Sequence, residues 1–197
     1  MKQVLFSILL ATLVLITPQN TFAHCDSVEG PVVVAAKKSL QTGNLNHVLI
    51  WVGEDDEAEI RNMFNKVNNV RNINEDVRNL ADMYFYETVV RVHRMGEGVG
   101  YTGIKNESFK PEEGIEAADI AIEKNSVKDI LAHLDEAEHE KVKHYFHELQ
   151  TKRNFDLNNI EAGRKYVESY VHFIHYVEGL FSGSNEHEHH SKEMHSH

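Results

Sequence analysis

The chain is poor in cysteine, proline and positive charge, and these shortages exclude several classes of protein. A single cysteine among 197 residues means that no disulfide forms within the chain, so packing alone holds its core. Acidic side chains outnumber basic ones, 31 to 20, which argues against a nucleic acid as the partner. The glycines of residues 96–114 lack the Gly-Lys-Ser/Thr ending of a phosphate loop, so they predict turns rather than a nucleotide site.

The one long apolar run stands at the N-terminus and predicts export. Lys2 precedes the run VLFSILLATLVLI, and small residues end the segment at Ala23, as signal peptidase prefers. The run is too short for a good membrane span, so residues 1–23 are predicted to be a signal peptide. Cleavage would leave a periplasmic or extracellular protein without a membrane span. Lipid attachment to Cys25 is the weaker alternative, because a lipid-modified cysteine normally follows a small residue and His24 stands there.

Helical periodicity runs through almost all of the remaining chain and predicts an all-α fold, a helical bundle. Residues 24–182 are predicted to be one helical domain, and residues 183–197 a disordered His-rich tail. The sequence does not specify the oligomeric state. The helices are expected at residues 31–43, 54–70, 75–95, 115–124, 127–133, 135–151 and 158–181. The short apolar run 44–52 could be a helix or a strand, and a short buried helix is favoured because no partner strand is evident.

Cleavage after Ala23 would create a chelating group, which we call the hook. The free α-amine, the imidazole of His24 and the thiol of Cys25 would lie within two residues of each other. This mixture of soft and borderline donors suits copper, nickel or zinc and does not suit magnesium or calcium. One thiolate cannot complete a four-coordinate site, so further ligands from the bundle are needed.

Histidines on the helices provide candidates for those ligands. His93 lies on the apolar face of its helix and is predicted to point into the core, where it either ligates a metal or bonds to a backbone carbonyl or Tyr86. Glu168, His172 and His175 follow one another at spacings of four and three, which place them on one stripe of the last helix. Of the three, His175 is expected nearest to the core. Other helical histidines are predicted to be solvated or at the edge of the apolar face, namely His133, His139, His144 and His147.

Two resemblances add to these inferences. The start His24-Cys25-Asp26, followed by Gly30 and a helix, resembles the N-terminal hook of nickel superoxide dismutase, in which the amine, a peptide nitrogen, a histidine and two thiolates hold the metal. Glu29 stands where that family has its second thiolate. The stretches GPVVVAAKKSLQTGN, VLIWV, ETVVRVHRMGEGVGYTG and YVHFIHYVEGL resemble an uncharacterised family of exported bacterial helical domains, which implies no activity.

Three hypotheses for the function follow. The first is a redox metalloenzyme resembling superoxide dismutase, which would take a small anion such as superoxide as substrate. The second is an extracytoplasmic protein that binds or handles copper, nickel or zinc without catalysis. The third is a helical domain that binds a protein partner and no metal. Under the first two, copper is expected before nickel or zinc, with His24 and Cys25 as ligands and His93 or His175 completing the set.

Overall fold

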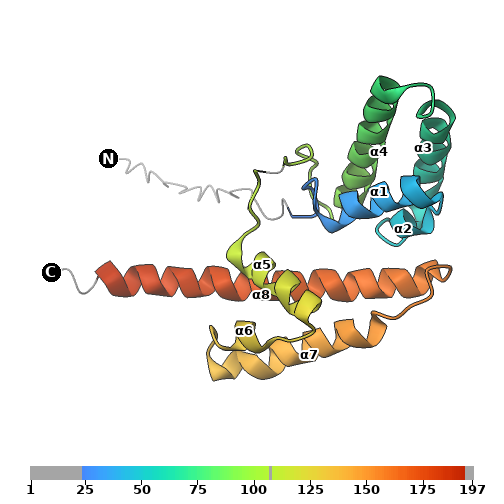
Figure 1. The fold of residues 1–197 in the computed structure, drawn as a ribbon. Helices are drawn as coiled ribbons and strands as arrows, with labels where there is room; N and C mark the ends of the chain where they lie inside the picture. The colour runs from blue at the N-terminus through green and yellow to red at the C-terminus, as the bar shows by residue number, and fades with distance from the viewer. Residues whose placement is uncertain (1–23, 107, 194–197) are drawn as a thin grey trace, which may run out of the picture.

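The computed structural model describes residues 24–106 and 108–193, with side chains described as far as residue 183. Within these residues every regular element is a helix, which confirms the predicted all-α class (Figure 1). The elements are α1 (Pro31–Thr42), α2 (Asn46–Leu49), the 3-10 turn η1 (Glu54–Asp56), α3 (Glu57–Val70), α4 (Glu75–Gly96), α5 (Glu113–Lys124), α6 (Lys128–Leu131), α7 (Glu136–Lys152) and α8 (Ile160–Glu193).

The helices α1 to α4 form a first group with its own hydrophobic core (Figure 1). Phe64 of α3 and Phe85 of α4 are buried in this core with ring centroids 5.7 Å apart. The turn between α3 and α4 ends at Asn74, whose side chain accepts a hydrogen bond from the backbone of Val77 and so caps α4. Gly43 ends α1 with a φ of 72°, a left-handed conformation that glycine adopts without strain.

The helices α5 to α8 form a second group, in which α5 and α7 pack along the long helix α8 (Figure 1). Its core contains Phe173, whose ring centroid lies 5.4 Å from that of Phe146. The approach of α5 to α8 is close enough to require glycine. A Cβ atom at Gly114 would lie 2.7 Å from the Cα atom of Glu178.

The two groups meet around Trp51, which packs against both cores. Its ring lies edge-on to Tyr170 of α8, with centroids 5.8 Å apart. Arg164 of α8 also crosses the junction, because it donates hydrogen bonds to the carbonyl oxygen of Val52 at 3.0 Å and to Glu57 at 2.6 Å. Apolar packing and charge-assisted hydrogen bonds therefore hold the groups together.

The predicted helix boundaries agree with the structure except at the end of the chain. The helix α8 continues to Glu193, beyond the end predicted at residue 181, and the disordered His-rich tail stays a prediction. Glycine at position 183 does not end the helix, because the residues after it include several that tolerate helix and no proline. Residues 194–197 and the predicted signal peptide lie outside the described residues. No helix in the described part is long and apolar enough to cross a membrane.

Candidate functional site

The hook lies at the junction of the two groups and is fastened there by the chain between α4 and α5. The backbone nitrogen of Lys105 donates to the carbonyl oxygen of Asp26 at 2.8 Å, and Val28 donates to the carbonyl oxygen of Lys105 at 2.9 Å. These bonds form an isolated parallel bridge between Ser27 and Lys105. The glycine-rich segment, for which the sequence predicted only turns, therefore also holds the hook in place.

The hook turns back tightly on itself over Gly30. A Cβ atom at this position would lie 2.1 Å from the carbonyl oxygen of His24 and 3.0 Å from that of Cys25. The Ser27 hydroxyl donates to the same His24 oxygen at 3.1 Å, which closes the turn. Any side chain at Gly30 would therefore displace both hook residues.

The imidazole of His24 is held by two residues of the second group. Its Nε2 atom lies 2.7 Å from Oδ2 of Asp119 on α5. The hydroxyl group of Tyr170 donates to the other oxygen of Asp119 at 3.0 Å and lies 3.5 Å from Nε2 of His24. In the neutral ring, a hydrogen bond from Nε2–H to this carboxylate leaves the lone pair on Nδ1, on the main-chain side of the ring. This orientation is the one that a carboxylate gives to a metal-binding histidine.

Beneath the hook lies a buried cluster of charged side chains. Asp26 is almost fully buried, and its Oδ1 lies 3.5 Å from Nε of Arg94, which is buried as well. Arg94 also donates to Glu97 at 3.0 Å. Burial raises the pKa of the Asp26 carboxyl, and the nearby Arg94 guanidinium opposes this rise. Arg94 therefore neutralises the part of the hook that faces the core.

The thiol of Cys25 lies in a pocket whose lining includes the charged side chains of Glu97 and Arg94. Burial is the main cause that raises its pKa far above the ordinary value, and the charges of Glu97 and Asp26 raise it further. The thiol is therefore protonated at neutral pH unless a cation binds next to it. A transition metal supplies such a charge, since a coordinating thiol loses its proton.

His175 is the predicted ligand that the fold brings to the hook. It lines a small pocket together with His24 and Cys25, although it stands on α8, far along the chain. The pocket also contains Glu97 and Tyr170. His175 is half-buried at 37% side-chain exposure, and its Nδ1 lies 2.9 Å from Glu178 on the next turn. It therefore has the same kind of carboxylate partner as His24.

His93 points into the core, as the sequence predicted, but it does not line this pocket. Its Nδ1 lies 2.8 Å from the carbonyl oxygen of Trp51, which is the backbone bond considered as the alternative to metal binding. Its Nε2 lies 3.4 Å from Oε1 of Glu97, which does line the pocket. The structure thus places His93 behind Glu97, with its buried Nε2 near that carboxylate but not hydrogen-bonded to it.

Glu168 and His172 are exposed on α8, and neither lines the pocket that contains His175. The stripe predicted on this helix is therefore not brought together as one set of ligands. The exposed positions of His133, His144 and His147 and the half-buried position of His139 agree with the sequence prediction. The tail histidines have no described side chains.

A second pocket of about 190 Å³ lies on the other side of His24. Its lining includes Ser27 and Glu29 from the hook and Asn106, Phe109 and Pro111 from the glycine-rich segment. His24 lines both pockets.

Sequence reasoning missed Asp119, Tyr170, Glu97 and Arg94. One signal was present, since Glu97 follows His93 by four residues and therefore lies on the same face of α4. Asp119 was also visible as an acidic residue within the otherwise apolar stretch AADIAI. Nothing in the local pattern indicated that α5 would place it against the hook.

Among the residues that the structure describes, no three His, Cys, Asp or Glu side chains are grouped closely enough to hold an ion. Two imidazoles and one thiol do line a common pocket, and these donors suit copper, nickel or zinc. Main-chain nitrogens of the hook would have to complete the site. The side chains of the described residues therefore do not make up a metal site by themselves.

The fold and site define a helical domain with an N-terminal hook packed at the junction of two helical groups. The chain belongs to a family of unknown function, DUF6448, whose match covers residues 29–176. The match includes Asp119, Tyr170 and His175 and begins after His24 and Cys25. No curated protein and no solved structure matches the chain.

Proposed function

We propose that this protein is exported and binds one transition-metal ion at the hook, copper before nickel or zinc. The proposal rests on the observation that His24, Cys25 and His175 line one pocket, although His175 is far from His24 and Cys25 in the sequence. The soft thiolate and the imidazoles favour copper, which also stands highest in the divalent affinity series. Export belongs to the proposal, since removal of residues 1–23 would free the α-amine of His24 for the ion.

In this proposal each residue has a separate role. His24 and Cys25 hold the ion through Nδ1 and the thiolate, together with the amine and the first peptide nitrogen. His175 completes the set from α8. Asp119 and Tyr170 keep the His24 ring in position, because they engage its other nitrogen. His93 acts through Glu97 rather than on the ion itself.

The charges around the pocket favour binding of a cation over reaction with an anion. Glu97, Asp26 and Asp119 all disfavour the thiolate, and Arg94 is engaged with Glu97 and Asp26. A site with this balance attracts a metal cation and repels superoxide. We therefore favour a protein that binds or handles a metal without catalysis. The experiment below distinguishes this function from partner binding without a metal.

The decisive experiment measures metal content and affinity of the processed protein by competition with a chromophoric copper chelator. We expect one tight ion per chain. The variants Cys25→Ser and His175→Ala, and a chain extended by one residue before His24, should each lose affinity by about tenfold or more. His144→Ala is the matched control, because this histidine is exposed on α7 and should bind as the wild type does. Full affinity in Cys25→Ser would contradict the proposal.

A dismutase remains a second candidate, since His24 of the hook also lines the pocket of about 190 Å³. We would measure superoxide dismutation by the copper-loaded and nickel-loaded protein. Activity that disappears in Cys25→Ser and persists in His144→Ala would support a redox enzyme. Stoichiometric metal binding without dismutation would leave metal handling as the function.

A further inference from the structure

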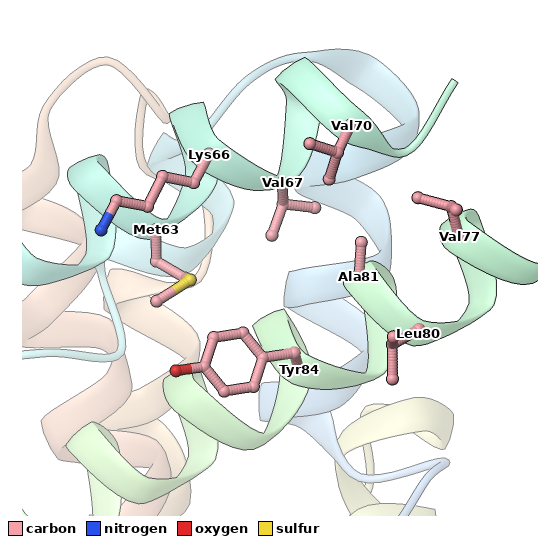
Figure 2. A pocket seen from close by; sticks show the side chains of 8 residues that line it. All are labelled: Met63, Lys66, Val67, Val70, Val77, Leu80, Ala81 and Tyr84. Atoms are coloured by element: carbon pink, nitrogen blue, oxygen red, sulfur yellow. The ribbon is translucent and has the colours of Figure 1, made fainter. Parts of the chain in front are cut away.

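A surface groove far from the hook runs between α3 and α4. It has a volume of about 480 Å³ and is lined by side chains from both helices (Figure 2). Figure 2 shows that the apolar side chains of the two helices face one another across it, with one lysine and one tyrosine hydroxyl among them. The lining residues are Met63, Lys66, Val67, Val70, Val77, Leu80, Ala81 and Tyr84.

The apolar groups around the groove are exposed to an unusual degree. Leu80 is 75% exposed and Tyr84 is 57% exposed, and Ile73 in the adjoining turn is 67% exposed. Val70 and Met83 are exposed close by. Single exposed hydrophobic residues are common on protein surfaces, whereas several of them gathered around one groove are a candidate for an interaction site.

The spacing of the lining residues shows what shape of occupant fits. Each helix contributes residues at intervals of three and four, the repeat of a helix that packs along its whole length against other helices. The opposite side of α4 already packs against α1, within the core of the first group. A pair of antiparallel helices with an open apolar seam is one half of a four-helix bundle. A second helical pair would therefore fill the groove.

Charge identifies which helical pair fits best. The segment from α3 to α4, residues 57–96, has six acidic and six basic side chains, whereas the whole chain has a net charge of −11. All of that excess negative charge lies elsewhere in the chain. Two copies can therefore bring this segment together without net repulsion. An anionic membrane would repel the remaining acidic surface.

We propose that the α3–α4 face is a dimer interface, in which a second copy of this chain packs its own α3 and α4 across the groove. The interface is isologous, so the exposed Leu80 of each copy enters the groove of the other. The proposal does not depend on metal binding, because the lining residues of the groove and those of the hook pocket are different.

Analytical ultracentrifugation of the processed protein tests this proposal. The wild type should sediment as a dimer that dissociates on dilution. Leu80→Glu should raise the dissociation constant by about thirtyfold or more, because it buries a charge at the centre of the interface. Val34→Glu introduces the same charge at a residue 49% exposed on α1, and it should change that constant by about twofold at most.

Cross-linking gives a second readout that does not depend on tolerance of a buried charge. In a Cys25→Ser background, Leu80→Cys should form a covalent dimer on mild oxidation, and Val34→Cys should not. A wild type that stays monomeric at all accessible concentrations would overturn the proposal. So would equal effects of the two glutamate variants, or binding of the wild-type monomer to vesicles of anionic lipid through Leu80.

Discussion

The two helical groups differ in how completely they bury their apolar residues. All of the exposed large hydrophobic side chains among the described residues lie between Val34 and Met95, in the first group. The second group covers its apolar residues with aromatic pairs such as Tyr145 with Tyr176 and Phe146 with Phe173. The second group is therefore closed by its own side chains, whereas the first has a face that another molecule can cover.

The candidate metal site belongs to neither group alone. His24 and Cys25 come from the hook, Glu97 from the end of the first group, and Asp119 and His175 from the second. Sites between packed units are common because loops and termini from both sides converge there. Substitutions within one group, between the groups and in the hook should therefore have separable effects.

The largest loss of stability is expected where the second group packs most closely. Gly114→Val would place side-chain atoms against the backbone of α8, since even a Cβ atom would lie 2.7 Å from Cα of Glu178. We expect a loss of about 3 kcal/mol in the free energy of unfolding and a fall of roughly 6–12 °C in the melting temperature. Circular dichroism recorded during thermal unfolding measures the change in melting temperature.

The matched control for this substitution lies on α8 itself. A Cβ atom at Gly179 would have no atom within 4 Å, so Gly179→Ala should stabilise the protein by about 0.5–1 kcal/mol through its helix propensity. If both variants were neutral, α5 would not approach α8 as closely as the structure shows.

A smaller loss of stability is expected when the contact between the two groups is removed. Arg164→Met removes the hydrogen bonds to Val52 and Glu57, and we expect it to cost about 1–2 kcal/mol in urea unfolding at pH 7. Arg61→Met is the control, because it removes a more exposed partner of the same carboxylate and should cost about 0.5 kcal/mol or less. Equal losses of stability in the two variants would show that the contact between the groups does not contribute to the free energy of unfolding.

The same pair of arginines gives a pH dependence. Burial would raise the pKa of Glu57, but hydrogen bonds from Arg61 and Arg164 outweigh it and hold the pKa below the ordinary value of 4.5. A lowered pKa in the folded state contributes stability above pH 4.5, which is lost as the pH falls through the folded value. The difference between wild type and Arg164→Met should therefore shrink in that acidic range.

Features of the fold that depend on neighbouring residues could be predicted from the sequence, whereas contacts between residues far apart in the sequence could not. Helix positions and the inward direction of His93 follow from local periodicity, and the structure confirms them. The pairing of His24 with Asp119 and Tyr170 depends on how α5 and α8 pack, since His24 and Tyr170 are 146 positions apart in the sequence. Periodicity shows which face of a helix is buried, but it does not show which helix covers that face.

A substitution in the hook should change the metal affinity more than the free energy of unfolding. Gly30→Ala forces the hook to open, because its Cβ atom would lie 2.1 Å from the carbonyl oxygen of His24. We expect a loss of about 1 kcal/mol in the free energy of unfolding of the metal-free protein, because opening the hook breaks the hydrogen bonds of Ser27 and Asp26 but leaves both helical cores packed. Copper affinity should fall by about tenfold or more, measured by chelator competition. A fall in stability as large as that of Gly114→Val would mean that the hook is part of the core.

The smallest effect on the single chain is expected at the open face of the first group. Leu80 is 75% exposed, so Leu80→Gln removes little packing within its own chain, and dilute protein should lose about 0.5 kcal/mol or less. A dimer responds differently, because association stabilises the folded state by mass action and makes the melting temperature rise with concentration. The melting temperature of the wild type should therefore rise between dilute and concentrated samples, and that of Leu80→Gln should stay nearly constant. A loss above about 2 kcal/mol in dilute protein would show instead that Leu80 packs within its own chain, and the first group would then be as closed as the second.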